Sequence, residues 1–141
     1  MAAYVLDTSV VVQRLIQDTH TPYVRALFQR LTETDDRLWV PEFCLVECAN
    51  VLWKAVRFRG MPPEQAVQLL TDLATLPLRV VPVSDLLPRA LTLGMTHNLS
   101  IYDSMYIAMV ERLACPLVTV DARQSQAAAA SGLMLKPVTD F

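Results

Sequence analysis

Short apolar runs alternate with longer amphipathic segments along the whole chain. The runs that indicate buried strands lie at residues 3–6, 38–40, 79–83 and 117–120. Between them, apolar residues recur at steps of three and four, which is the period of a helix with one buried face. Strands separated by connections of helix length pair in parallel. The pattern therefore predicts a three-layer α/β/α sandwich, a single domain over residues 1–141 whose parallel sheet has four strands, or five if residues 133–136 add one.

Proline, glycine and hydroxyl residues place the helix boundaries. Thr21 followed by Pro22 predicts a helix start with Thr21 as the cap, and Gly60 ends a long helix over residues 43–58. Ser84 predicts the cap of a helix that runs to about residue 97. Further helices are expected after residues 7 and 62 and over residues 101–113 and 122–131.

The composition supports a globular domain. Hydrophobic residues make up 53% of the 141 residues and charged residues 18%, which excludes a disordered tail. No apolar run approaches the ~18 residues of a membrane-spanning helix, and the first residues lack the features of a secretory signal, so a cytoplasmic protein is expected. The three cysteines lack the grouping of a zinc site and are expected to be reduced core residues: Cys44, Cys48 and Cys115.

The net charge of −2 excludes binding of nucleic acid through bulk basic charge alone. Of the 12 cationic side chains only Lys54 and Lys136 are lysines, and the arginine excess suits bidentate phosphate binding. A genome-wide codon bias would produce the same excess and is the simpler interpretation.

Three aspartates stand where strands end or helices begin. Asp7 follows the first strand, Asp121 follows the fourth, and Asp103 opens the helix that leads into the fourth strand. In an open parallel sheet all three positions lie at the carboxyl edge, where ligands bind. Each is also an ordinary helix-start residue, because Asp caps helices and interacts favourably with the helix dipole. A catalytic role therefore requires that the three meet in space.

Glu47 is a fourth acidic candidate. It begins a narrow polar stripe with Asn50, Lys54 and Arg57 on an otherwise apolar helix, and this stripe either faces solvent or lines a cleft. Two carboxylates ~5 Å apart repel by roughly 3 kcal/mol at an effective dielectric constant of ~20, so four that meet need a divalent cation or shared protons. Ligation by carboxylates alone favours Mg²⁺ or Mn²⁺ over zinc.

Four segments together resemble the signature blocks of PIN-domain ribonucleases. In chain order they are residues 5–10 (VLDTSV), 46–52 (VECANVL), 101–108 (IYDSMYIA) and 118–121 (VTVD). The resemblance covers nearly the whole chain and is closest to the VapC-type toxins of bacterial and archaeal toxin–antitoxin pairs. It implies an endoribonuclease that needs Mg²⁺ or Mn²⁺, forms a homodimer and is neutralised by an antitoxin that inserts a segment into the active-site groove.

The resemblance also assigns expected roles by position. The acids of the catalytic, metal-binding quartet would be Asp7, Glu47, Asp103 and Asp121. The polar side chains that assist them or position water would be Ser9, Asn50 and Thr119. The cations that guide RNA along the groove wall would be Arg14, Lys54, Arg57 and Arg59, although solvated surface cations would show the same pattern.

The expected reaction is in-line attack of water on phosphorus, giving 5′-phosphate and 3′-hydroxyl products. A carboxylate-held metal lowers the pKa of bound water, and Asp7 or Asp103 would accept its proton. The alternative is a non-catalytic PIN-like module that binds RNA or a protein without cutting.

The chain has more apolar residues than the core needs, which predicts partner interfaces on the surface. The candidate residues are Leu15, Phe58, Met61, Met95 and Met134.

Overall fold

The computed structural model describes residues 2–141, which form a parallel sheet with the strand order β3-β2-β1-β4. The strands are β1 (Ala3–Leu6), β2 (Arg37–Pro41), β3 (Leu78–Val81) and β4 (Leu117–Val118). Every pairing is parallel, so the α/β class and the parallel sheet are confirmed. The expected fifth strand is a single bridge between Leu117 and Leu135. It ends there because Pro137, which has no N–H to continue a ladder, directs the chain into a short 3₁₀ turn.

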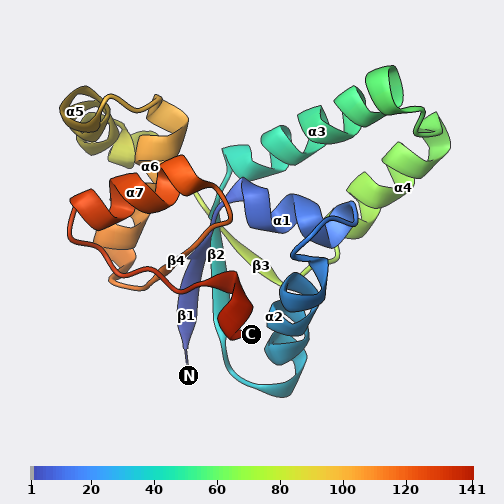
Figure 1. Ribbon diagram of the computed structural model, residues 1–141, viewed down its shortest axis with the longest axis horizontal. Helices are drawn as coiled ribbons and strands as arrows, with labels where there is room; N and C mark the ends of the chain where they lie inside the picture. The colour runs from blue at the N-terminus through green and yellow to red at the C-terminus, as the bar shows by residue number, and fades with distance from the viewer. Residues whose placement is uncertain (1) are drawn as a thin grey trace.

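Helices connect the strands (Figure 1). They are α1 (Thr8–Leu15), α2 (Thr21–Glu33), α3 (Phe43–Arg59), α4 (Pro63–Leu73), α5 (Leu87–His97), α6 (Ile101–Leu113) and α7 (Ala122–Ala130). Two 3₁₀ turns, η1 (Ser84–Leu86) and η2 (Val138–Asp140), complete the described chain. None of these helices combines the length and apolar character that crossing a membrane requires.

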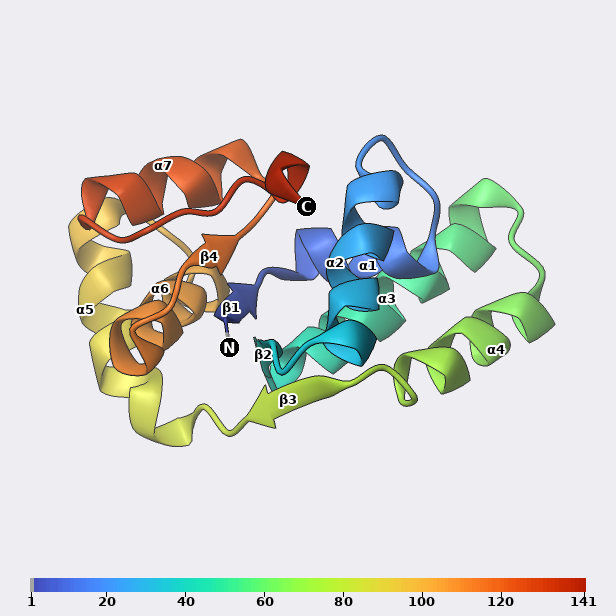
Figure 2. The ribbon, with the colours of Figure 1, turned by 90° about the horizontal axis from the view of Figure 1, so that it is seen from below.

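The sheet has one hydrophobic core on each face. Successive side chains of a strand point to opposite faces, so Tyr4 and Leu6 enter one core and Val5 enters the other. The first core is completed by α1, α2 and the start of α3, and the second by α5, α6 and α7. Figure 2 shows these two groups of helices on either side of the sheet. The three-layer arrangement is therefore confirmed.

Two predicted caps are wrong. The Thr21 hydroxyl accepts from Asp18 N (2.8 Å) and donates to Gln13 O (2.9 Å), so it joins α2 to the preceding loop, and His20 occupies the cap position. Ser84 begins η1, and α5 starts only at Leu87, because Pro88 favours the first turn of a helix. The predicted end of α3 is confirmed: Gly60 adopts φ 73°, a left-handed conformation that a Cβ would strain.

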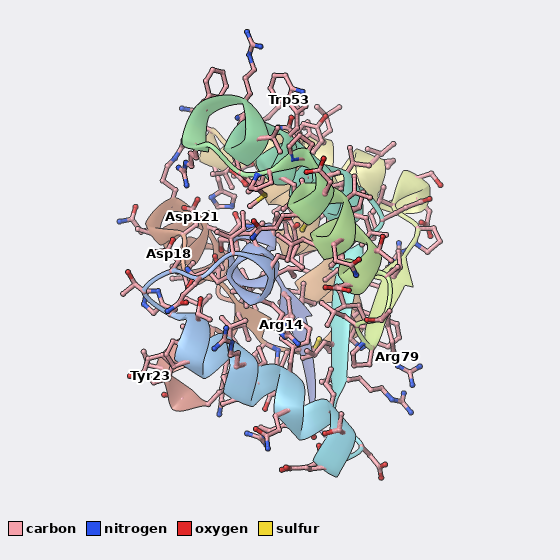
Figure 3. The ribbon with its side chains drawn as sticks, turned by 90° about the vertical axis from the view of Figure 1, so that its right-hand side faces the viewer. Arg14, Asp18, Tyr23, Trp53, Arg79 and Asp121 are labelled. Atoms are coloured by element: carbon pink, nitrogen blue, oxygen red, sulfur yellow. The ribbon has the colours of Figure 1, made fainter. Side chains whose placement is uncertain are left out.

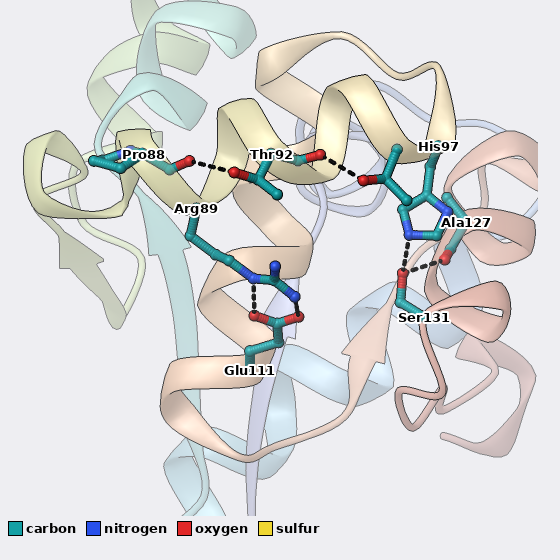
Figure 4. A network of polar contacts seen from close by, with 8 residues as sticks. Pro88, Arg89, Thr92, His97, Glu111, Ala127 and Ser131 are labelled. Carbon is teal, nitrogen blue, oxygen red and sulfur yellow. Dashed lines mark hydrogen bonds and ion pairs between the residues drawn. The ribbon is translucent and has the colours of Figure 1, made fainter.

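Polar contacts hold α5 against α6 and α7 (Figure 4). Arg89 forms two 2.8 Å hydrogen bonds with the Glu111 carboxylate, and His97 Nε2 lies 3.1 Å from Ser131 Oγ. Exposed ion pairs of this kind stabilise a fold only weakly, so their main effect is to orient α5.

The predicted state of the three cysteines is confirmed, since each is buried and free within residues 2–141.

A hairpin of α3 and α4 projects from the rest of the molecule (Figure 1). Helix α3 leaves the carboxyl edge of the sheet, and α4 returns along it. Helix α4 buries one residue, Leu73, whereas the buried residues of α3 extend along its length to Ala55. The hairpin thus carries side chains from the sheet edge out into solvent.

Candidate active site

Asp7 lies at the carboxyl end of β1 and is only 7% exposed. It occupies the cap position of α1, yet its side chain makes no capping hydrogen bond. Instead its Oδ2 accepts hydrogen bonds from Ser9 Oγ and from Thr119 Oγ1, both at 2.8 Å. Within the described residues Oδ1 accepts none, so this carboxylate is oriented by two hydroxyls and keeps one oxygen available for a ligand.

The environment of Asp7 disfavours its negative charge. Burial is the largest cause that raises the pKa of Asp7, and the charges of Asp103 and Asp121 raise it further, while the hydrogen bonds from Thr119 and Ser9 lower it. Asp103 and Asp121 are thus near enough to act on Asp7 although both are remote in sequence. A buried carboxylate with two acidic neighbours favours a cation.

Asp103 stands in the first turn of α6 without serving as its cap. Ser100 has that role, because its Oγ accepts from Asp103 N at 3.2 Å. In residues 2–141 neither carboxylate oxygen of Asp103 accepts a hydrogen bond, so both remain available. The cap interpretation, which the sequence alone leaves open, does not describe the Asp103 side chain.

Asp121 differs from the other two aspartates. It is exposed, and its Oδ1 caps α7 by accepting from Arg123 N (2.8 Å) and Gln124 N (3.2 Å). Its backbone N–H donates to Thr119 Oγ1 at 3.0 Å, so Thr119 contacts both Asp7 and Asp121. Asp121 therefore caps a helix with one oxygen and offers Oδ2 to the site.

Glu47 is held by two hydroxyls that the sequence analysis did not select. Its Oε1 accepts from Thr8 Oγ1 at 2.8 Å and from Tyr106 OH at 3.3 Å. Tyr106 OH also lies within hydrogen-bond distance of Thr8 Oγ1, so its one proton is shared between Thr8 Oγ1 and Glu47 Oε1, and Thr8 N donates to Tyr106 OH at 3.2 Å. The network joins α1, α3 and α6, the helices that follow or carry Asp7, Glu47 and Asp103.

Tyr106 is protonated in this network. Desolvation by burial is the main cause that raises the pKa of Tyr106, and nearby negative groups add to it. A signal for this role was present in the sequence, since Tyr106 lies three residues after Asp103 on the same helix face, and a buried tyrosine needs a partner for its hydroxyl.

Gln124 is another residue of the site that could not be selected from the sequence, and it contacts both Asp103 and Asp121. It is 1% exposed, and its Nε2 donates to Asp103 O at 2.9 Å while its backbone N–H donates to Asp121. Gln at the third position after a capping Asp usually reaches back to that cap. Here the Gln124 side chain reaches across to α6, the helix that carries Asp103, and so fixes the start of α7 against it.

The remaining predicted site residues lie farther out. Asn50 is exposed, and in the described chain no hydrogen bond joins it to Glu47. Lys54, Arg57 and Arg59 are exposed on α3. Arg14, on α1, instead lines a shallow hollow with residues of α2, and Figure 3 shows it well apart from Trp53 of α3. The structure thus groups three of the four predicted cations and separates the fourth.

The donor set suits a hard cation, although the acids are not gathered as tightly as ligands are. Among residues 2–141, no three side chains of His, Cys, Asp or Glu are close enough together to hold one ion. Within the described residues, the four acids keep five carboxylate oxygens without hydrogen bonds: Asp7 Oδ1, Glu47 Oε2, Asp121 Oδ2 and both oxygens of Asp103. Such donors match Mg²⁺ or Mn²⁺ in chemistry.

Comparison with known proteins assigns the family. The sequence profile of the PIN domain matches residues 4–130, a span that includes all four acids. Ribonuclease VapC12 of Mycobacterium tuberculosis is 29% identical over 122 residues, which cover 86% of this chain and 89% of that protein. Ribonuclease VapC3 of Pyrobaculum aerophilum is 26% identical over 100 residues, covering 70% of this chain and 76% of that protein.

A solved structure shares the fold. The crystal structure of DNA-bound VapBC from Salmonella typhimurium contains a chain with a TM-score of 0.73 at 15% identity, covering 98% of this chain and 99% of that one. Identity this low supports the architecture alone, whereas the profile match extends over most of the sequence. The chain belongs to the PIN domain family.

Proposed function

We propose that this protein is a metal-dependent endoribonuclease that hydrolyses RNA phosphodiester bonds and acts as the toxin of a toxin–antitoxin pair. The observation that carries the proposal is the placement of Asp7, buried, held by two hydroxyls and close to the charges of Asp103 and Asp121. The names of the VapC ribonucleases similar to this chain support RNA as the substrate.

The proposed cofactor is Mg²⁺, or Mn²⁺ in its place, held by oxygens of Asp7, Glu47, Asp103 and Asp121. When bound, it supplies stabilisation of the charge that develops on the phosphoryl oxygens and lowers the pKa of a water molecule. The chain orients the ligands: Ser9 and Thr119 fix Asp7, and Thr8 and Tyr106 fix Glu47.

Asp103 is the residue best placed to accept the proton of the attacking water. Both of its carboxylate oxygens are without hydrogen bonds in the described part of the chain, whereas Asp7 Oδ2 already accepts two. A base with free lone pairs can approach the water directly. After in-line attack, the departing 3′ oxygen takes up a proton, which leaves 5′-phosphate and 3′-hydroxyl ends.

The proposed partners are an antitoxin and a second copy of this chain. The relation to VapBC supports the antitoxin, and exposed apolar side chains support both contacts. Of the five apolar residues selected from the sequence, Phe58, Met95 and Met134 are exposed, and Leu15 and Met61 are partly buried. An RNA substrate and an antitoxin partner both fit a cytoplasmic protein. Light scattering at high concentration tests the dimer, and a monomer would contradict it.

Cleavage of single-stranded RNA with Mn²⁺ tests the catalytic proposal. We expect the wild-type protein to cut, EDTA to stop it, and Asp7→Asn to abolish it. Asp35→Asn is the matched control, because Asp35 is exposed and its side chain makes no hydrogen bond or ion pair within residues 2–141. Equal cutting by wild type and Asp7→Asn would identify a contaminant and overturn the proposal. RNA binding without cutting under any divalent metal would favour the non-catalytic module.

A further inference from the structure

The outer half of α3, residues 51–59, combines exposed aromatic rings with unpaired cations. Trp53 is 55% exposed and Phe58 is 70% exposed, although both are large apolar side chains. Three cations accompany them: Lys54, Arg57 and Arg59. None of these forms an ion pair within residues 2–141, and the sequence from residue 48 to residue 63 contains no acid. Surface cations are usually only solvated, but an exposed apolar patch indicates a binding site. The combination of the two on α3 therefore requires a functional explanation.

These side chains are packed against one another. The rings of Trp53 and Phe58 meet edge to face, with centroids 6.3 Å apart. The Arg57 guanidinium lies 6.0 Å from the Trp53 centroid and 5.5 Å from the Phe58 centroid. A guanidinium held over ring faces keeps its N–H groups free to bind phosphate in a fixed orientation. We call these three residues the aromatic–arginine cluster.

We propose that the aromatic–arginine cluster is a subsite that stacks unpaired bases of single-stranded RNA. Base stacking on aromatic rings, with arginine and lysine along the backbone, is the general mode by which proteins hold single strands. This inference deepens the proposed ribonuclease function and rests on it for the identity of the bound strand.

The position of the cluster links it to the active site. Glu47 and Phe58 are on the same helix, and a rise of 1.5 Å per residue places them roughly 16 Å apart along its axis. A strand lying along α3 would thus contact the acids at one end and the cluster a few nucleotides away. In Figure 3, Trp53 lies at the edge of the view opposite Tyr23, which belongs to α2.

A protein segment is the competing occupant. An apolar groove between α3 and α4 adjoins the cluster, and Trp53 is one of its lining residues along with Val67 and Leu70 of α4. A peptide in this groove would bury side chains of both helices. Arg57 and Phe58 of the cluster are outside the groove lining and suit a polyanion with flat bases better. Substitutions on α4 separate the two occupants, because base stacking on the cluster does not involve α4.

The test measures binding in full-length Asp7→Asn protein, so that RNA is not consumed and a failure of cleavage does not affect the result. The probe is a fluorescein-labelled single-stranded RNA of eight nucleotides, followed by anisotropy. We expect Trp53→Ala and Phe58→Ala each to weaken binding roughly tenfold, because one stacked base is lost. Arg57→Ala should weaken binding and reduce the salt dependence by about one phosphate contact. Val67→Ala is the matched control on α4 and should bind as the parent does.

A second probe separates stacking from charge. A strand of the same length with abasic spacers keeps the phosphates and lacks the bases. We expect it to bind more weakly than RNA to the parent, and to bind equally to the parent and to Trp53→Ala. Unchanged RNA affinity in both Trp53→Ala and Phe58→Ala, or equal affinity for RNA and the abasic strand, would overturn the proposal. Reduced RNA affinity in these variants together with an inactive wild-type protein would support the subsite and reject the ribonuclease proposal.

Discussion

The inner and outer halves of α3 share one backbone but differ in what surrounds their side chains. In the inner half, residues 43–50, Glu47 is hydrogen-bonded by Thr8 from α1 and Tyr106 from α6. In the outer half, Trp53 and Phe58 are exposed, meet edge to face and lie under the Arg57 guanidinium. Substitutions in the inner half should therefore change the geometry of the acids, whereas those of the exposed residues in the outer half should change affinity for a ligand and leave the fold intact.

The largest effect is expected from Glu47→Gln. Glutamine can still accept from Thr8 and Tyr106, but its amide nitrogen cannot ligate a cation where Oε2 would. We expect cleavage to fall at least ~100-fold, because loss of an outer partner alone typically costs 10–100-fold at metal sites. The measurement is the single-turnover cleavage rate at saturating Mn²⁺. Glu42→Gln, an exposed acid at the start of the same helix, is the control, and a Glu47→Gln rate within threefold of wild type would remove Glu47 from the ligand set.

The next effect concerns the hydroxyls that hold Glu47. Tyr106→Phe deletes one donor to Oε1 and leaves Thr8 N–H without its partner. We expect a ~10–100-fold weaker apparent affinity for Mn²⁺ and a loss of stability of about 1–3 kcal/mol from the unpaired amide. Calorimetric Mn²⁺ titration and thermal unfolding measure the two effects separately.

Thr8 provides the matched pair for this prediction. Thr8→Ser keeps a hydroxyl that can reach Glu47 Oε1, whereas Thr8→Val removes it at similar volume. If the Thr8 hydroxyl positions Glu47, Thr8→Ser should bind Mn²⁺ almost normally, and Thr8→Val should bind it more weakly. If Tyr106→Phe and Thr8→Val lower only the unfolding temperature, the network is structural and does not position Glu47.

The third prediction concerns the charge of Asp7. Its pKa is raised in the folded protein, mainly by burial, so at pH values between the unfolded and folded pKa the folded state binds more protons than the unfolded state. The free energy of unfolding therefore falls as the pH rises through that interval. Above the folded-state pKa the protein bears the full cost of burying the ionised Asp7 carboxylate. Asp7→Asn removes the penalty while its side-chain oxygen can still accept from Ser9 and Thr119.

Thermal unfolding in metal-free buffer checks this prediction. Asp7→Asn should unfold at a higher temperature than wild type near pH 8, and the gain should shrink as the pH is lowered through the folded-state pKa of Asp7 toward its unfolded-state pKa. Asp35→Asn should show no such trend. An Asp7→Asn variant that is less stable at pH 8 than at pH 5, relative to wild type, would contradict a raised pKa at Asp7. Stability gained by removing a buried charge at the cost of activity is a common trade at functional sites.

Local patterns predicted the elements that bear the acids, but not the contacts that orient them. The end of β1 placed Asp7, and Gly60 placed the end of α3, because these signals depend on neighbouring residues. Asp121 was expected directly after the fourth strand, but β4 ends at Val118, and Asp121 is positioned as the cap of α7. The contacts from Thr8 and Tyr106 to Glu47 join residues 39 and 59 positions apart, so no local pattern encodes them. The bridge at Leu135 was overpredicted as a strand for a related reason, since its extent depends on where Pro137 turns away from β4.

The smallest effect on stability is expected from Trp53→Ala, on the exposed side of the outer half of α3, and the neighbouring Leu52 provides a direct contrast. Leu52 is 3% exposed and Trp53 is 55% exposed. Leu52→Ala should destabilise the protein by about 2–5 kcal/mol through a cavity, whereas Trp53→Ala should cost about 1 kcal/mol, the value of an aromatic contact on a ring that is mostly exposed. Chemical denaturation with both variants measures the difference. A loss above ~2 kcal/mol in Trp53→Ala would mean that the Trp53 ring is a structural part of the α3–α4 hairpin, and reduced RNA binding by that variant would then no longer report stacking.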